Sequence, residues 1–141
     1  MMIEKLTVSA TLDSLKNIAE YVAKVSNLAN LDKKAMYKLR LAIDELATNI
    51  ISYAYSENNI IGDIFLESEI SDQVLSIKIK DSGIPFDPTT KLDLESETID
   101  IPIEERKIGG LGIFLAFDGV DEFSYERINN ENVNTLKIYH K

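Results

Sequence analysis

The spacing of apolar residues switches between two periods along this 141-residue chain, and that switch most constrains how it can fold. From residue 12 to residue 54 the apolar side chains recur every three or four positions, which is typical of amphipathic helices. From residue 62 to residue 81, and again after residue 120, they alternate with polar side chains, which is typical of half-buried strands. The pattern therefore predicts helices packed against a sheet.

The N-terminal part predicts one strand and two helices. Residues 2–9 alternate loosely and predict an edge strand, after which Thr11 can cap a helix that ends near Asn30. Asp32 then begins a second helix, which has the strongest helical pattern in the chain. The apolar residues that share one face of this helix are Leu39, Ala42, Ile43, Leu46, Ala47, Ile50, Tyr53 and Ala54.

The period-two segments predict two hairpins. Residues 62–70 and 74–81 form the first, joined by a short turn. Residues 121–128 and 133–139 form the second, with a turn over the asparagine-rich residues 129–132.

The segment between the two hairpins carries all three prolines and has no sustained period. It predicts a long loop over about residues 82–108, followed by a short apolar helix inside residues 109–119. Glycines flank the loop at both ends, which suggests hinges and a mobile lid. The order of elements predicts an α+β two-layer sandwich in a single domain over residues 1–141, with helices on one face of an antiparallel-rich mixed sheet.

Composition and charge exclude several classes of protein. The chain has no cysteine, which rules out disulfide scaffolds and cysteine-zinc sites, and its net charge of −9 argues against sequence-independent binding of nucleic acid or anionic lipid. No apolar run approaches the roughly 20 residues that cross a bilayer, and the first residues lack the layout of a signal peptide. We therefore expect a cytoplasmic protein with no direct partner among nucleic acids or membranes.

Glu45 and Asn49 lie four residues apart on the second predicted helix. At 100° per residue their directions differ by about 40°, so both side chains point the same way at the border of the apolar face. An amide carbonyl is a suitable ligand for a hard divalent cation, and a nearby carboxylate can accept a proton from a nucleophile. The spacing is common, however, and an ordinary solvated polar face has the same pattern.

Asp81 is in phase with the apolar residues of its strand, so its carboxylate faces the core and needs a partner. Such a carboxylate can accept a hydrogen bond from an exocyclic amine, which is one way to select adenine. Gly83 follows and permits close backbone approach or a positive φ. The alternative is that Asp81 simply begins a turn.

Three glycines in four residues, Gly109, Gly110 and Gly112, precede the short apolar helix. They free the backbone to present N–H groups at a helix N-terminus, where phosphates bind, although a plain hinge has the same composition. The phosphate-binding loop of the Walker type and the dinucleotide-binding glycine motif are both missing. The single histidine, His140, is next to the last residue and fits a solvated tail.

Three stretches in this order carry a family resemblance: D-E-L-A-T-N at residues 44–49, D-S-G-I-P-F-D-P at residues 81–88, and G-G-L-G-I at residues 109–113. They resemble the N, G1 and G2 boxes of GHKL ATPases, which have the Bergerat ATP-binding fold. Within that superfamily the chain is similar to the bacterial anti-sigma-factor serine kinases, the RsbW and SpoIIAB group. The apolar-aromatic residues 50–55 after the N box add to this similarity.

The resemblance implies a site for ATP and Mg²⁺. By this analogy Glu45 is the general base that activates the attacking serine hydroxyl, and Asn49 is the Mg²⁺ ligand. Asp81 receives the adenine amino group, and Gly83 leaves room for the ring. Phosphoryl transfer needs mainly positioning and charge neutralisation, which such a set supplies.

Further roles follow from the same resemblance. Gly110 and Gly112 let the lid close and give backbone N–H groups to the phosphates, while Thr135 on the last strand supports the adenine pocket. Some relatives have an arginine directly before the G2 glycines, where this chain has Ile108. Lys107, or the preceding Arg106, could contact the terminal phosphate instead.

The implied function is that of an ATP- and Mg²⁺-dependent serine/threonine protein kinase. It phosphorylates an anti-anti-sigma protein with a STAS domain and sequesters a sigma factor, in the regulatory scheme called partner switching; by analogy it forms a homodimer. The alternative is a nucleotide-sensing binding module without chemistry. The catalytic domain of a two-component histidine kinase fits less well, because no phosphoacceptor helix precedes the boxes.

Overall fold

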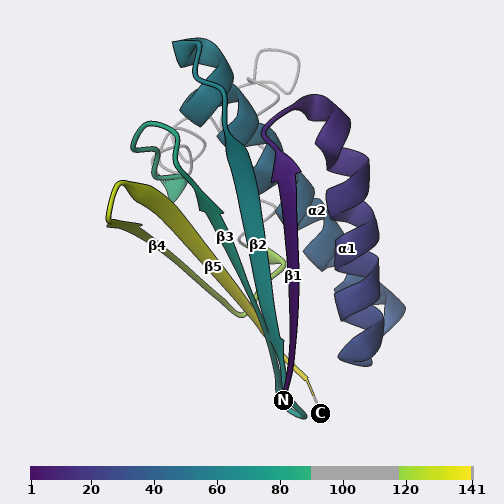
Figure 1. The fold of residues 1–141 in the computed structure, drawn as a ribbon. Helices are drawn as coiled ribbons and strands as arrows, with labels where there is room; N and C mark the ends of the chain where they lie inside the picture. Colours follow the sequence, from purple (N-terminus) through teal and green to yellow (C-terminus); the bar gives the residue numbers. More distant parts are fainter. Residues whose placement is uncertain (90–117, 141) are drawn as a thin grey trace, which may run out of the picture.

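The computed structural model describes residues 1–89 and 118–140, and their helices and strands form two layers (Figure 1). Two helices cover one face of a five-stranded sheet, so the predicted α+β sandwich is confirmed. The strands are β1 (Met2–Ser9), β2 (Asp63–Ile70), β3 (Val74–Asp81), β4 (Glu122–Ile128) and β5 (Glu131–Tyr139). The helices are α1 (Leu15–Leu28) and α2 (Lys33–Asn49), with the short turns η1 (Leu12–Ser14), η2 (Ile50–Tyr55) and η3 (Ser56–Asn58).

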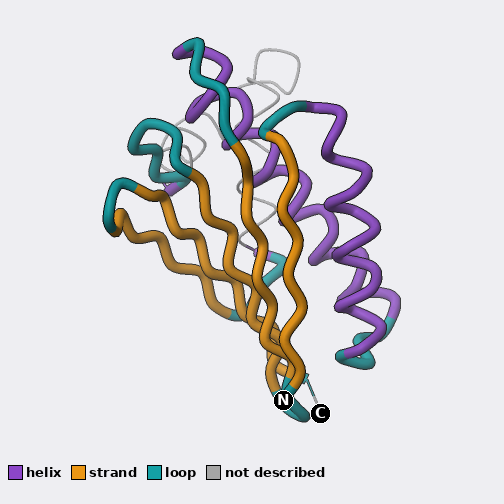
Figure 2. Tube along the Cα trace, viewed as in Figure 1, coloured by secondary structure: helices purple, strands orange, loops and turns teal. Residues whose placement is uncertain are grey.

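The sheet has the order β1-β2-β3-β5-β4, and all neighbouring strands in the described part of the chain run antiparallel. The predicted edge strand is confirmed as β1, and both predicted hairpins are present as β2–β3 and β4–β5 (Figure 2). The pairing of β3 with β5 places the second hairpin beside the first, and Asp81 lies opposite Asn132 in this register.

The turn of the second hairpin is shorter than predicted. β5 begins at Glu131, so the connection consists of Asn129 and Asn130, with φ angles of 51° and 66°. Two successive residues with positive φ give the turn twist that matches paired strands, and asparagine tolerates this conformation better than most residues. The prediction that residues 129–132 form a turn is therefore wrong for Glu131 and Asn132, which belong to the strand.

Of the two predicted helix caps, the one at Asp32 is present and the one at Thr11 is not. The Asp32 side chain accepts a hydrogen bond from the Ala35 backbone N–H at 2.7 Å, so the predicted cap of α2 is confirmed. Thr11 precedes η1 instead of the α-helix, and no capping hydrogen bond from its side chain is present in the described structure. The prediction that Thr11 caps the first long helix is wrong, because one 3₁₀ turn intervenes before Leu15.

The chain continues from α2 into η2, a short π-helix, without a break. The predicted apolar face extends into it, since Ile50 and Ala54 are buried. Tyr53 is half-buried and its ring stacks on Phe86, with 5.3 Å between the ring centroids. Single π turns occur often at functional sites, and this one directly follows Asn49.

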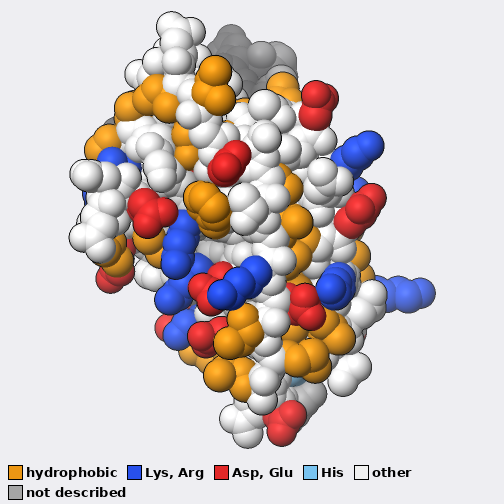
Figure 3. Space-filling view, viewed as in Figure 1, with side chains coloured by type: hydrophobic (Ala, Val, Ile, Leu, Met, Phe, Trp, Pro, Cys, Tyr) orange, Lys and Arg blue, Asp and Glu red, His pale blue; other side chains and the backbone are white. Residues whose placement is uncertain are grey.

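The hydrophobic core lies between the helices and the sheet. Its fully buried members include Val25, Ile43, Leu46, Ile64 and Ile79. The opposite face of the sheet carries interspersed acidic and basic side chains (Figure 3), among them Glu67 between two lysines at 4.0 Å each. Among the described helices, none combines the length and apolarity that a membrane span requires.

Candidate functional site

The C-terminal end of the α2 segment lies against the C-terminal end of β3. The Ile84 backbone N–H donates a hydrogen bond to the Ala54 carbonyl at 3.1 Å. The Ser82 N–H donates to the hydroxyl of Tyr55 at 2.8 Å. The loop after Asp81 is thus fastened to η2, the segment that directly follows the α2 helix with the predicted acid–amide pair.

Asp81 is fully buried, as its phase in the strand predicts. Its Oδ1 accepts hydrogen bonds from the Gly83 N–H at 3.0 Å and from the Asn132 amide at 2.8 Å. Its Oδ2 is buried and has no hydrogen-bond partner among the described residues. Burial raises the pKa of this carboxyl, although the hydrogen bonds from Asn132 and Gly83 and the charge of Arg127 oppose that rise.

A buried carboxylate oxygen without a partner is costly, by about 1–3 kcal/mol and more when it is charged. A ligand that donates a hydrogen bond to Oδ2 removes this cost. An exocyclic amine is such a donor. The geometry of Asp81 therefore fits the recognition of an amino-substituted ring.

Gly83 is required by a close approach to η2. A Cβ at this position would lie 2.5 Å from the Ala54 carbonyl oxygen and 2.7 Å from the Ala54 Cβ. Distances below 3.0 Å are essentially never seen for real Cβ atoms. Of the two reasons that the sequence offered for this glycine, the structure supports close backbone approach, since its φ is not positive.

Glu45 and Asn49 point the same way, as the helical spacing predicts. The Asn49 amide nitrogen donates to the Glu45 backbone carbonyl at 2.7 Å and to its Oε1 at 3.0 Å. Asn49 is 4% exposed and Glu45 is half-buried. Burial raises the pKa of the Glu45 carboxyl, opposed by the hydrogen bond from Asn49.

This pairing assigns separate tasks to the two ends of the Asn49 amide. Because its nitrogen is directed at Glu45, its carbonyl oxygen is the group it can offer to a cation. Within residues 1–89 and 118–140 there is no cluster of three His, Cys, Asp or Glu side chains that could hold a metal.

Two asparagines on β5 belong to this site and were missed by the sequence analysis. Asn132 and Asn134 are both buried on the face that carries Asp81. Asn134 is fully buried, and neither polar atom of its amide has a partner in the described part of the structure. The signal was the alternation that identified Asp81, because both residues are in phase with the buried Leu136 and Ile138.

Thr135 is not brought to the site. It pairs with the exposed Lys78 and lines a depression on the other face of the sheet, with Ser76 and Lys137. Successive strand residues point to opposite faces, so Thr135 faces away from Asp81. The expectation that Thr135 supports a pocket beside Asp81 is wrong, and its neighbour Asn134 is the residue that faces the right way.

The remaining predicted site residues lie outside the described residues. These are Lys107, Gly110 and Gly112, together with residues 90–108 of the predicted lid and the short helix predicted at 113–117.

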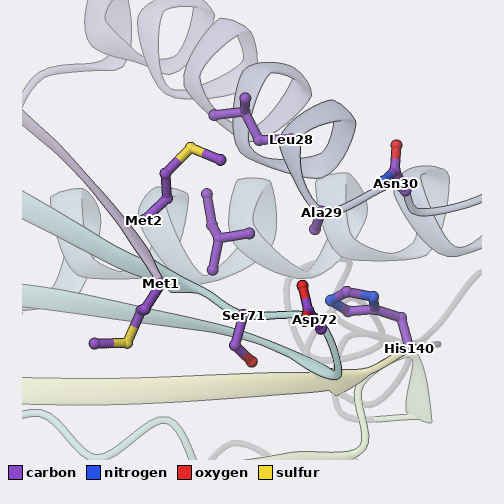
Figure 4. Close-up of a pocket in the computed structure, with 9 residues that line it drawn as sticks. Met1, Met2, Leu28, Ala29, Asn30, Ser71, Asp72 and His140 are labelled. Atoms are coloured by element: carbon purple, nitrogen blue, oxygen red, sulfur yellow. The ribbon is translucent and has the colours of Figure 1, made fainter.

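A cavity of about 410 Å³ lies elsewhere in the molecule (Figure 4). Met1, Asp72 and His140 line it, and it sits beside the β2–β3 turn, at the opposite end of β3 from Asp81. None of the described site residues lines this cavity. We therefore place the candidate site at the Asp81 end of the sheet.

Comparison with known proteins finds relatives of this chain. The family model of the histidine kinase-like ATPase domain matches residues 8–139. Proteins named serine-protein kinase RsbW from Staphylococcus aureus strains JH9 and Newman are 33% identical over 103 residues. Each match covers 72% of this chain and 65% of the relative, so the similarity spans about two thirds of those proteins.

A solved structure has the same fold. The crystal structure of the RsbU and RsbW domains of a Mycobacterium tuberculosis protein superposes with a TM-score of 0.65 at 13% sequence identity. The superposition covers 98% of this chain and 32% of the other. At this identity the match bears on the fold alone.

Proposed function

Because the chain belongs to the family of histidine kinase-like ATPase domains, we propose that it binds ATP with Mg²⁺ and transfers the terminal phosphate to a serine or threonine of a partner protein. The Staphylococcus aureus relatives are named serine-protein kinases, which supports this class of reaction. The proposal assigns the adenine end to Asp81 and the phosphate end to the Glu45–Asn49 pair.

The observation that carries the proposal is the unpartnered Oδ2 of Asp81. Adenine differs from guanine and hypoxanthine at C6, where it has an amino group that donates hydrogen bonds. A carboxylate that is fixed through Oδ1 and buried at Oδ2 accepts such a donor and has no donor of its own to offer a carbonyl. Asn134, whose amide is also buried and unpartnered among the described residues, is a second group that can meet the base.

The chemistry at the phosphate end needs a base and a cation site. In this proposal Glu45 accepts the proton of the attacking hydroxyl, and its raised pKa makes the carboxylate a better proton acceptor. The Asn49 carbonyl holds Mg²⁺, which neutralises phosphate charge when bound. Asn49 also fixes the Glu45 carboxylate through its amide nitrogen at 3.0 Å.

The partners come from the similarity to the RsbW relatives. We propose an anti-anti-sigma protein with a STAS domain as the phosphate acceptor and a sigma factor as the sequestered partner.

Phosphoryl transfer tests the catalytic part. Purified protein is incubated with Mg²⁺-ATP and a recombinant STAS-domain protein, and phosphoserine and phosphothreonine are mapped by mass spectrometry. We expect Glu45→Ala to abolish transfer and keep ATP affinity, while Glu20→Ala, an exposed glutamate on α1, retains transfer. Transfer by the Glu45 variant at the wild-type rate would remove the catalytic assignment. ATP binding without any transfer by the wild type would favour the nucleotide-sensing module instead.

A further inference from the structure

Asn132 uses every hydrogen-bonding position of its side chain, on Asp81, on the loop that follows it and on Tyr125. Its amide nitrogen donates to Asp81 Oδ1 and to the Ile84 carbonyl, both at 2.8 Å. Its carbonyl oxygen accepts from the Phe86 N–H at 3.2 Å and from the hydroxyl of Tyr125 at 2.6 Å. A side-chain amide offers two donors and an acceptor oxygen with two lone pairs, so this one is saturated.

One of these contacts, together with the Gly83 N–H, holds the Asp81 carboxylate in place. The Asn132 amide and the Gly83 N–H both bind Oδ1, so the carboxylate cannot rotate without breaking two hydrogen bonds. The orphan oxygen is thus held in one direction by a residue 51 positions away in the sequence.

The β4–β5 hairpin holds the loop after Asp81 from one side. Arg127 on β4 donates to the Gly83 carbonyl at 2.9 Å. Tyr125, two residues earlier on the same face of β4, donates a hydrogen bond from its hydroxyl to the Asn132 side-chain carbonyl oxygen. On the other side η2 holds the same loop through the Ile84–Ala54 hydrogen bond. The loop after Asp81 is therefore clamped between η2 and the β4–β5 hairpin.

We propose that Asn132 is a positioning residue that orients Asp81 and so sets the selectivity of the site for purines with a 6-amino group. The inference rests on the proposed nucleotide function and deepens it. Asn132 acts through Asp81, so its contribution exists only for a ligand that hydrogen-bonds to the Asp81 carboxylate. A purine with hydrogen at C6 makes no such bond, so its affinity does not depend on Asn132.

This difference separates a positioning role from a merely structural one. Affinities for ATP and for purine riboside triphosphate, which lacks the 6-amino group, are measured by calorimetry on the wild type, Asn132→Ala and Asn17→Ala. Asn17 is an exposed asparagine on α1 and serves as the matched control. We expect Asn132→Ala to weaken ATP binding about tenfold, the value of one hydrogen bond to a charged group. Its affinity for purine riboside triphosphate should stay within about twofold of the wild type, as should both affinities of Asn17→Ala.

Tyr125→Phe provides a second variant should Asn132→Ala fail to fold. It removes one hydrogen bond that orients the Asn132 amide and leaves the ring in place. We expect a smaller loss of ATP affinity of the same kind, again without a loss for purine riboside triphosphate. Parallel losses for the two nucleotides, or unchanged ATP binding in both variants, would overturn the role of Asn132. A wild type that binds neither nucleotide would instead overturn the proposed function itself.

Discussion

Replacing Gly83 with alanine should separate the loop after Asp81 from η2. The new Cβ would lie 2.5 Å from the Ala54 carbonyl oxygen and 2.9 Å from its carbonyl carbon, which are backbone atoms that cannot rotate away. The loop must move, and the Ile84–Ala54 hydrogen bond at 3.1 Å is the first to be lost.

The size of the effect follows from three contributions. Overpacking costs about 1–3 kcal/mol, and the lost hydrogen bond costs about 1 kcal/mol. The lower entropy of the unfolded alanine chain offsets about 0.4–1 kcal/mol. The net destabilisation is about 1–3 kcal/mol, which moves a urea midpoint down by about 1 M when the slope is about 2 kcal/mol per M.

Urea unfolding followed by circular dichroism measures this shift. Ser82→Ala is the matched control, because Ser82 is exposed and the hydrogen bond it makes to Tyr55 comes from its backbone. We expect Gly83→Ala to lose ATP affinity together with stability, since Gly83 also donates to Asp81 Oδ1. An alanine variant that unfolds at the wild-type midpoint and binds ATP normally would refute the contact between this loop and η2.

Three further predictions concern the site and the layer contacts. Burial raises the pKa of Asp81 above its value in the unfolded chain, so ionisation of this carboxyl opposes folding. The stability of the wild type relative to Asp81→Asn should therefore fall as pH rises above about 4. A difference in urea midpoints that does not change with pH would contradict this. Tyr21→Phe removes hydrogen bonds to the Glu4 carbonyl, at 2.9 Å, and to the buried Ser68 hydroxyl. Urea titration should show that it lowers the free energy of unfolding by about 1–2 kcal/mol. No change would mean that water replaces both bonds. Asn49→Ala should abolish the Mg²⁺ dependence of ATP affinity, while ATP affinity without metal stays within about twofold of the wild type. Calorimetry with and without Mg²⁺ measures both affinities. An intact Mg²⁺ dependence would remove Asn49 as a ligand.

Local patterns predicted most of the fold and the first half of the site. The alternation of β3 identified Asp81 as a core-facing carboxylate, and the helical spacing of Glu45 and Asn49 placed both on one side of α2. These are properties of a single element, so one strand or helix is enough to reveal them. The Asp32 cap and the first hairpin are of the same kind.

The second half of the site depends on contacts between distant segments. Asn132 meets Asp81 across 51 residues, and only the pairing of β3 with β5 brings them together. A run of asparagines favours a turn in any local reading, although two residues with positive φ suffice here. Asn134 lay inside the predicted strand and in phase with Leu136 and Ile138, whereas Thr135 was chosen from the family resemblance and faces outward.

Local sequence patterns also could not predict the π-helical turn. Apolar residues continue at helical spacing from α2 into η2, and the spacing cannot distinguish a π turn from an α turn over six residues. Its role is visible only through its partners, the backbone of Ile84 and Ser82 in the loop after β3.

Calorimetric titration of the wild type and Asp81→Asn with Mg²⁺-ATP tests most directly whether this carboxylate recognises adenine. The exposed turn residue Asp72 provides the matched control, Asp72→Asn. Wild type and control should bind with equal affinity, and Asp81→Asn should bind at least about tenfold more weakly, because its amide replaces a charged acceptor that the adenine amine needs. Equal affinity in all three proteins, or no binding by the wild type, would contradict the account.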